Sequence, residues 1–311
     1  MTRATAWTPA EDAFVRHLVQ EGKDSAEIAA LCQADGIQRT QKAIQRRRER
    51  CGWHARVAES PVVCRKFTDR VRVEGDALVF ADPHWPFHHA PFMNRCVDVA
   101  LGLGIDTVGI GGDITDQSVF SKWGRDKGVE WSHEKDATKQ GVRALLSNFK
   151  RVVLCPGNHD VRMIRQSQGS INEDDWVDMM RDWFGGVSPQ RLIITPYHMY
   201  HIVSGGRPFR ITHPKESNRV PTSVALRLNA KFRESMVTAH SHTTGVRRDP
   251  SGQDYLVDLG PCCDDERMRY VQIEDNTRPK MTRCALLLVD GAPLLLEEDT
   301  LPVYERLRLA A

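Results

Sequence analysis

The chain has 311 residues, of which 41% are hydrophobic and 27% are charged, and its formal net charge is +2. This length predicts one or two domains, and the composition is ordinary for a soluble globular protein. No run approaches the roughly 20 apolar residues that span a bilayer, which excludes a membrane-spanning chain. Residues 1–11 carry no apolar stretch like that of a signal peptide, so we expect a cytoplasmic protein.

The eight cysteines are scattered and form no CxxC pair. Disulfide frameworks usually occur in much shorter secreted chains, so we expect reduced thiols. Cys262 and Cys263 are adjacent, but neighbouring residues rarely bind one metal ion, and we assign them no metal-binding role.

The positive charge is concentrated near the N-terminus. Residues 1–56 contain 10 Lys/Arg and 7 Asp/Glu, a net charge of +3, whereas the rest of the chain contains 33 and 34, a net charge of −1. Only Glu49 interrupts a basic cluster formed by Arg39, Lys42, Arg46, Arg47, Arg48 and Arg50. Clustered cations of this kind favour a nucleic-acid partner.

Residues 7–53 predict three short helices. In residues 8–11, Thr-Pro-Ala-Glu, the threonine is a typical N-cap, the proline suits the first helical position and the glutamate completes a capping box. Either Asp24 or Ser25 caps the second helix. The third helix is predicted over residues 41–50, which hold most of the basic cluster.

Two short helices followed by a basic third helix form the arrangement of a helix-turn-helix, whose last helix enters the major groove of DNA. The tryptophans at both ends and the run Arg-Thr-x-x-Ala-Ile-x-x-Arg over residues 39–47 resemble Myb/SANT-like and related modules. We therefore expect a small all-α DNA-binding domain over residues 1–56, a linker over 57–70 and a second domain over 71–311. The alternative is a helical bundle that contacts proteins, with its arginines on a solvated face.

From residue 71 onward, apolar runs rich in Val, Ile and Leu alternate with helical stretches, which predicts an α/β core. The runs expected as strands are residues 77–81, 107–110, 152–154, 209–212 and 236–239, and those expected as helices include residues 92–103 and 133–149. Later strands over 255–259 and 284–297, the second broken by an Asp-Gly turn at 290–291, predict a second sheet that completes a sandwich.

Each early strand is followed by a polar cluster, and open α/β sheets place their ligand sites at this edge. The clusters are Asp82-Pro83-His84, Gly111-Gly112-Asp113, Gly157-Asn158-His159-Asp160, His213 and His240-Ser241-His242. Alternation along a strand turns His240 and His242 to the same side. Oxygen and imidazole ligands without cysteine suit Mn²⁺, Fe or Zn²⁺ better than a thiolate site would.

The order DxH, GD, GNHD, H and HxH resembles the signature of the calcineurin-like metallophosphoesterases, and the resemblance covers Asp82 to His242. It implies a two-sheet β-sandwich flanked by helices, with two divalent metal ions, Mn²⁺ foremost and Fe, Zn²⁺ or Ni²⁺ as alternatives. The implied ligands are Asp82, His84 and His242 for one ion, Asn158, His213 and His240 for the other, and Asp113 as the bridge. We choose His213 over His198 and His201 because it directly follows a strand-like run.

The resemblance implies hydrolysis of a phosphate ester by in-line attack of a metal-bound hydroxide on phosphorus. In this reaction His159 is expected to protonate the leaving oxygen or to hold the transition-state phosphate. Asp160 is expected to orient an imidazole from behind the ligands. The catalytic residues implied are therefore His159 and Asp160.

The basic helical domain favours nucleic-acid phosphodiesters, DNA foremost, as the substrate, an arrangement that resembles phage or mobile-element phosphoesterases. Residues 113–118 lack the Asp-Arg-Gly run of phosphoprotein phosphatases, which argues against a serine/threonine phosphatase. Arg162, Arg165 and Lys215 are candidates for further phosphate contacts. Two alternatives stay open: an enzyme for nucleotides or phosphoproteins, and a DNA-binding regulator with an inactive phosphoesterase fold.

Overall fold

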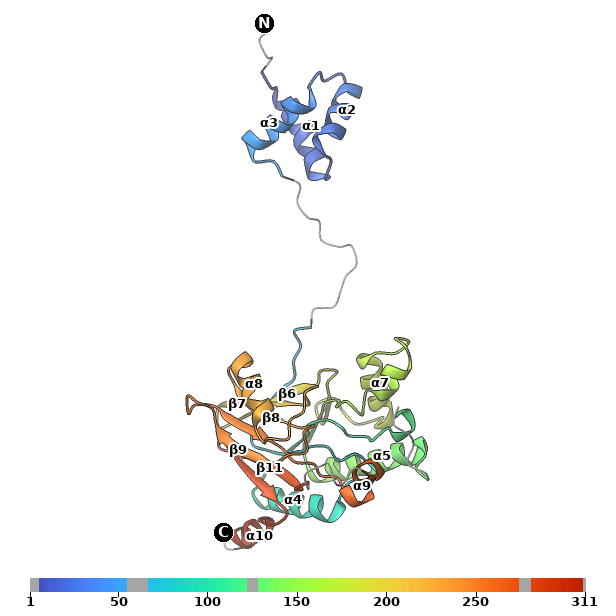
Figure 1. Ribbon diagram of the computed structural model, residues 1–311, viewed down its shortest axis with the longest axis vertical. Coiled ribbons are helices and arrows are strands. Elements are labelled where there is room, and N and C mark those ends of the chain that lie inside the picture. Colours follow the sequence, from blue (N-terminus) through green and yellow to red (C-terminus); the bar gives the residue numbers. More distant parts are fainter. Residues whose placement is uncertain (1–5, 55–66, 122–127, 274–280, 310–311) are drawn as a thin grey trace. The chain divides into compact units, whose positions relative to one another are not determined.

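The chain divides into two compact units, residues 1–66 and 67–311. A computed structural model, drawn in Figure 1, describes residues 6–54, 67–121, 128–273 and 281–309. Most of the linker expected over 57–70 lies outside the described residues. None of the described helices is both long and apolar enough to cross a membrane. Each unit has a hydrophobic core of its own.

Three helices make up the first unit: α1 (Pro9–Gln20), α2 (Ser25–Ala34) and α3 (Gln41–Cys51). Each helix begins at a side-chain cap, supplied by Thr8, Asp24 and Thr40. The first two caps are complete capping boxes, which satisfy backbone N–H groups that a helix leaves free at its start. α3 ends at Gly52, whose φ of 65° is the left-handed conformation that favours glycine.

The core of the first unit is small and consists of Val15, Leu18, Val19, Ile28, Cys32 and Ile44, with Trp7 and Trp53 packed against it. All three helices contribute to it. A core of this size stabilises a short chain only modestly, so contacts between polar side chains matter more here than in a large domain.

The second unit is built on two six-stranded sheets. The first sheet has the order β12-β11-β2-β3-β4-β5 and contains β2 (Ala77–Phe80), β3 (Thr107–Ile110), β4 (Arg151–Leu154), β5 (Leu192–Ile194), β11 (Cys284–Val289) and β12 (Ala292–Glu297). β2 to β5 run parallel, and β11 is antiparallel to both of its neighbours, β2 and β12. The predicted α/β core is confirmed in these strands.

The second sheet has the order β1-β6-β7-β8-β10-β9. It contains β1 (Arg72–Glu74), β6 (Met199–Ser204), β7 (Arg207–Thr212), β8 (Ser235–Thr238), β9 (Gly245–Arg248) and β10 (Tyr255–Asp258). Parallel pairs join β7 to β8 and β8 to β10, whereas the outer strand β9 is antiparallel to β10.

The assignment of strands to sheets corrects two predictions. The hairpin over residues 284–297 was expected in the second sheet, but it extends the first, where Leu286 lies opposite Val79. Conversely, β7 and β8 were expected in the α/β core and instead lie in the second sheet. Both errors share a cause, because β8 and β11 are almost wholly buried and have no exposed face to show which layer they join.

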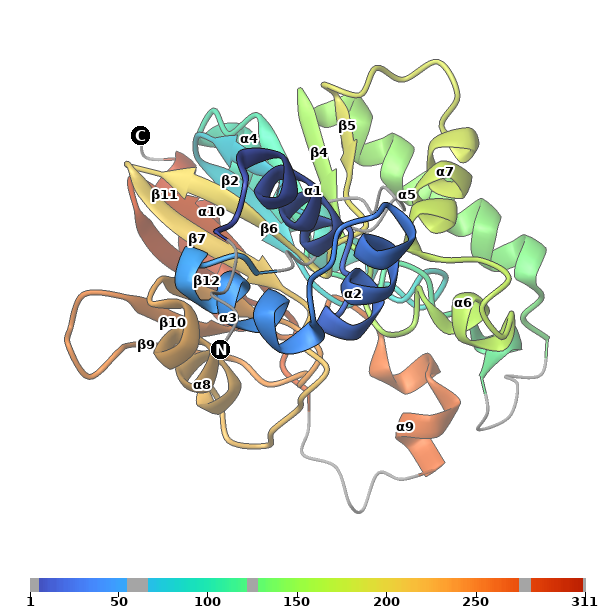
Figure 2. The same ribbon diagram turned by 90° about the horizontal axis from the view of Figure 1, so that it is seen from above.

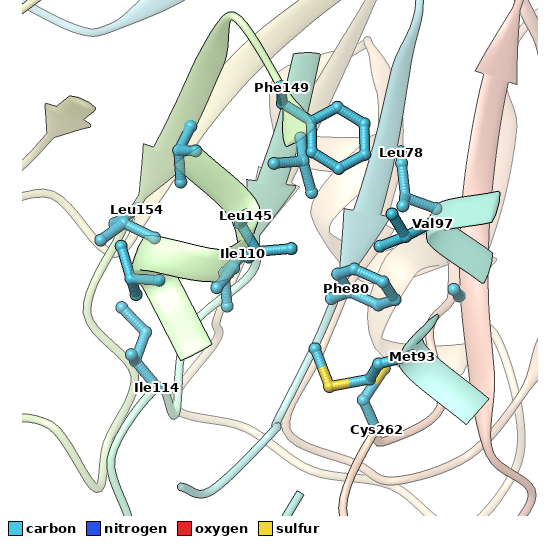
Figure 3. Packing of buried hydrophobic residues seen from close by; sticks show 14 of the residues in the cluster. Leu78, Phe80, Met93, Val97, Ile110, Ile114, Leu145, Phe149, Leu154 and Cys262 are labelled. Atoms are coloured by element: carbon cyan, nitrogen blue, oxygen red, sulfur yellow. The ribbon is translucent and has the colours of Figure 1, made fainter. Parts of the chain in front are cut away.

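Helices cover the first sheet on one side. α4 (Ala90–Gly102), α5 (Trp131–Asn148) and α7 (Glu173–Trp183) enclose the larger core, to which α10 (Leu301–Leu309) also contributes. In Figure 3, Leu78 and Phe80 of β2 lie beside Val97 of α4, and Ile110 of β3 lies beside Leu145 of α5. The two long helices, predicted over 92–103 and 133–149, are thereby confirmed.

The other face of the first sheet packs against the second sheet. Side chains alternate along β2, so that Leu78 and Phe80 face the larger core under the helices. Ala77 and Val79 face the core between the two sheets. α8 (Ser223–Phe232) covers the outside of β8 and β10 (Figure 2). Short helical segments complete the unit: η1 (Ser118–Phe120), α6 (Arg162–Gln166), η2 (Asp265–Arg267) and α9 (Arg269–Ile273).

Candidate metal centre

The predicted ligands follow the C-terminal ends of strands in both sheets and meet in one place. Asp82, His84 and His242 each offer an atom within 4.8 Å of the others, and so do Asp113, His213 and His240. The first sheet thus supplies residues after β2 and β3, and the second sheet supplies residues after β7 and β8.

Asp113 lies between these two groups. Its Oδ2 atom is 3.7 Å from His84 Nε2 in the first group and 3.4 Å from His213 Nε2 in the second. Asn158 joins the second group, since its Oδ1 atom is 2.8 Å from His213 Nε2. All the side chains of the expected ligand set are therefore gathered around the Asp113 carboxylate.

The residues fit divalent metal ions. Asp82 and His84 are fully buried, yet Asp82 Oδ1 and His84 Nε2 have no hydrogen-bond partner among the described residues. Leaving such atoms unpartnered in the interior is costly, and a cation would supply the missing partner. Carboxylate, amide and imidazole ligands are those of Mn²⁺, Fe and Zn²⁺ sites.

Five of the predicted ligands have a left-handed backbone. The φ angles are 48° for Asp82, 46° for His84, 48° for Asp113, 73° for His240 and 54° for His242. Residues other than glycine rarely adopt this region, and each instance costs about 1 kcal/mol or more. The surrounding fold must hold these five residues in place, as is common at functional sites.

This backbone also corrects the expectation for the last motif. β8 ends at Thr238, so His240 and His242 lie beyond the strand and do not follow its alternation. They enter different groups, His240 beside Asp113 and His242 beside Asp82. The left-handed backbone at His240 and His242, and not a strand face, directs each imidazole to its group.

Two glycines allow the loops to approach closely. A Cβ atom at Gly157 would lie 2.1 Å from Asp113 N and Oδ1, and one at Gly112 would lie 2.5 Å from His213 Nδ1. No side chain fits at either position. Gly112 has in addition a φ of 94°, so both space and conformation require glycine there.

His213 occupies the place expected of it. Its Nδ1 atom is 3.0 Å from the carbonyl oxygen of Gly111, which can only accept, so Nδ1 carries the proton and Nε2 faces Asp113 and Asn158. Burial opposes a charged ring, but the Asp113 carboxylate raises the pKa of His213 to about 9. His201, the rejected alternative, is instead bonded to Glu234 at 3.0 Å.

Asp116 is a site residue that the sequence did not reveal. It is buried, its Oδ1 atom lies 2.9 Å from His159 Nδ1 and 3.2 Å from His84 Nδ1, and its backbone oxygen also faces His159 Nδ1 at 3.1 Å. Burial would raise the pKa of Asp116, but the two imidazoles hold it below its usual range. The only sequence signal was an acidic residue three positions after Asp113 in the same loop.

Asp160 does not have the role expected of it. Its carboxylate accepts hydrogen bonds from the backbone N–H groups of Ile114, Thr115 and Gly157 at 2.8–2.9 Å, and from the Thr115 hydroxyl at 2.8 Å. No imidazole among the described residues bonds to it. Asp160 thus joins the loop after β3 to the loop after β4, and Asp116 is the carboxylate that contacts His159.

The basic cluster of the first unit divides into two sets. Arg39 donates to both carboxylate oxygens of Glu11 at 2.9 Å and lies over the Trp7 ring, with 4.6 Å between its Cζ atom and the ring centroid. Arg47 pairs with Asp12, and Arg48 donates to the Ser25 hydroxyl at 2.9 Å. These three arginines hold the helices together.

The other set consists of Lys42, Arg46 and Arg50. All three side chains are exposed on α3 and have no ion-pair or hydrogen-bond partner among the described residues. Since they are four residues apart, they form one row along the helix, named the α3 stripe below. Of the further candidates, Arg165 and Lys215 are exposed, whereas Arg162 is partly buried beside His159.

Comparisons with known proteins place the second unit in a family. The family model described as calcineurin-like phosphoesterase matches residues 76–266. No curated protein matches the chain in sequence.

Solved structures with a similar fold include Vps29 from Entamoeba histolytica complexed with Zn²⁺ (13% identity, TM-score 0.35, covering 71% of this chain and 97% of that one). Vacuolar protein sorting 29 from Cryptosporidium parvum has 13% identity and a TM-score of 0.38 over 72% and 96% of the two chains. The phosphoesterase YfcE from E. coli has 13% identity and a TM-score of 0.34 over 71% and 98%. On the match over residues 76–266, the chain belongs to the calcineurin-like phosphoesterase family and is a metal-dependent phosphoesterase.

Proposed function

We propose that this phosphoesterase hydrolyses phosphodiester bonds in nucleic acids, DNA foremost. The observation that carries the proposal is the α3 stripe, three exposed cations that have no partner among the described residues, on a helical unit of the same chain. Rows of Lys and Arg bind the phosphate backbone and release its counterions. The described fold of the first unit, two short helices and a basic third, supports the same partner.

In the catalytic unit, we assign Asp82, His84 and His242 to one divalent ion, Asn158, His213 and His240 to the other, and Asp113 to both, with Mn²⁺ as the first choice of metal. Bound there, the ions would orient the phosphate and neutralise the charge that builds on its oxygens. The neutral Asn158 amide adds no negative charge near the phosphate.

His159 is the residue that we assign to the leaving oxygen or the transition-state phosphate. Its backbone N–H donates to Asp113 Oδ1 at 2.7 Å, and its Nδ1 is held by Asp116. This contact fixes the ring so that Nε2 points to the side of Asp113, where Asp113 Oδ2 lies 3.9 Å away. Asp116 acts through His159 and is therefore a positioning residue.

The test uses the full chain loaded with Mn²⁺ and incubated with single- and double-stranded DNA and RNA. We expect cleavage that is absent in Asp113→Asn. A triple Lys42→Gln, Arg46→Gln, Arg50→Gln variant should bind DNA more weakly, and the slope of its log affinity against log salt should be smaller by about 3.

A matched control removes three other exposed cations without partners among the described residues, in Arg16→Gln, Arg143→Gln, Arg306→Gln. This variant has the same net charge as the α3 stripe variant and should keep the salt dependence of the native protein. If the α3 stripe variant binds DNA with the native salt dependence, the α3 stripe does not contact DNA. If the native protein cleaves none of the nucleic acids, the nucleic-acid proposal is wrong, and hydrolysis of nucleotides or phosphopeptides would then identify the substrate class.

A further inference from the structure

Arg162 places a guanidinium group beside the centre. It is the first residue of α6, and its side chain is 18% exposed. Nη1 donates to the backbone oxygen of Asp116 at 2.7 Å, and Nη2 lies 2.9 Å from His159 Nε2. Among the described residues, the carboxylate oxygen nearest to the guanidinium group is Asp116 Oδ2, 3.9 Å from Nη1.

These contacts fix which atoms donate. A guanidinium group has only donors, so His159 Nε2 must accept the hydrogen bond from Arg162. The proton of the imidazole then lies on Nδ1, where both neighbours, the Asp116 carboxylate and the Asp116 backbone oxygen, are acceptors. One arrangement satisfies every partner, and within the described part of the chain the other three of the five N–H groups of Arg162 have no acceptor.

The location of these unused donors indicates their ligand. His159 Nε2 lies 3.9 Å from Asp113 Oδ2. Only the imidazole of His159 therefore separates the guanidinium group of Arg162 from the Asp113 carboxylate. The Asp116 carboxylate is already engaged by two histidines. A mostly buried cation beside such a site is best satisfied by an anion with several oxygens.

We propose that Arg162 binds a non-bridging oxygen of the substrate phosphate. Anchored by the Asp116 backbone oxygen, it presents N–H groups to the phosphate and directs the ester toward His159. Because His159 needs a proton on Nε2 to act on the leaving oxygen or the phosphate, Nη2 of Arg162 moves from Nε2 to the phosphate when the ester binds. This proposal rests on the phosphoesterase activity of the family and not on a nucleic-acid substrate. It assigns a specific substrate contact to a residue that the sequence named only as a candidate.

The experiment measures phosphate affinity and catalysis separately in Arg162→Met, with Arg143→Met as the control. Arg143 lies on α5, is exposed and has no side-chain partner among the described residues, so the change in charge is matched. Two quantities are measured in Mn²⁺-loaded protein: hydrolysis of bis(p-nitrophenyl) phosphate, and binding of inorganic phosphate by calorimetry. Metal content and melting temperature are recorded for each variant.

We expect Arg162→Met to weaken phosphate binding and to lower kcat/KM, each by roughly 10- to 100-fold, the usual effect of one charge-assisted hydrogen bond. Arg162→Lys should recover part of both losses, and Arg143→Met should change neither. If Arg162→Met retains native phosphate affinity with full metal content, Arg162 only supports the Asp116 loop and the proposal fails. Failure to cleave DNA would not affect this result, because neither probe is a nucleic acid.

Discussion

In the first unit the carboxylates of Glu11 and Asp12 lie on α1 and pair with arginines of the basic cluster, whereas in the second unit Asp113 and Asp160 are buried. Arg39 is a main cause of a pKa of about 2 for Glu11. Burial raises the pKa of Asp160 to about 6, although four donors bond to its charged form.

The difference shows two uses of the same functional group. The first unit has a small core, and its ion pairs fasten three short helices at the surface. In the second unit the large core already stabilises the fold, and buried carboxylates fix loops and ligands in positions that the chemistry needs. The two kinds of carboxylate should therefore respond differently to substitution.

The largest effect is expected for Asp113→Asn. An amide oxygen can still accept from His159 N–H, so the fold should be retained, but the charge shared by the two ligand groups is lost. We expect kcat/KM for bis(p-nitrophenyl) phosphate to fall at least roughly 1000-fold, which corresponds to about 4 kcal/mol. Metal analysis should show fewer bound ions. Native activity with native metal content would refute the assignment of this carboxylate.

Asp160→Ala tests the buried carboxylate that has no place among the ligands. It leaves three backbone N–H groups and one hydroxyl without an acceptor, each buried. Because an unsatisfied buried donor costs roughly 1–3 kcal/mol and the loops can relax, we expect the free energy of unfolding to fall by about 3 kcal/mol. Urea denaturation measures this, and Asp160→Asn should lose less. A loss below about 1 kcal/mol would show that the loops do not depend on this residue.

Glu134→Gln tests a buried carboxylate beneath the same loop. Glu134 Oε1 accepts from Ser118 N at 3.0 Å, while Oε2 is buried without a partner among the described residues. Burial raises the pKa of Glu134 to about 7, with Asp116 adding to the rise. A folded-state pKa above that of the unfolded chain means that stability is lost as the pH rises from about 4.5 through 7.

The glutamine keeps the bond to Ser118 and cannot ionise. At pH 5 the variant and the native protein should have similar melting temperatures, whereas at pH 8 the variant should be more stable by about 2 kcal/mol. Melting curves across this range measure the difference. Parallel pH profiles for the two proteins would mean that Glu134 ionises normally.

The smallest effect is expected in the first unit. Arg39→Ala removes the bidentate pair with Glu11 and should destabilise α1 by about 1 kcal/mol, whereas Lys42→Ala, which removes a cation of the α3 stripe, should change stability very little. Hydrogen exchange of the α1 amides in the full chain reports this local stability. Equal protection in the two variants would remove the distinction between Arg39, which pairs with Glu11, and the cations of the α3 stripe.

The sequence predicted the parts of the site that depend on local order. Strand ends were recognisable from apolar runs, and the polar cluster after each one contains side chains that the fold brings together, Asp82 and Asp113 among them. Contacts between distant loops were not recognisable. Asp160 meets Thr115, 45 residues away in sequence, through backbone N–H groups that every residue possesses. The residue types of the partners therefore do not reveal that a carboxylate bonds to their backbone.

Two other outcomes have similar physical reasons. The hairpin of β11 and β12 was found but given to the wrong sheet, since a strand buried on both faces has no alternation to place it. In the basic cluster, Arg39 and Arg46 have the same side-chain chemistry, and only the position of Glu11 in space separates them. Charge counts show that a cluster exists and do not show which of its members are free.

The candidate metal centre draws its residues from both layers of the sandwich. The proposed ligands after β2, β3 and β4 belong to one sheet, and those after β7 and β8 belong to the other. Ions held by both sheets would act as a cross-link between the layers. The free energy of unfolding would then depend on the concentration of the metal. An ion present at 100 times its dissociation constant adds about 2.7 kcal/mol to the free energy of unfolding. Scarcity of metal would then shorten the lifetime of the folded enzyme as well as slow its turnover.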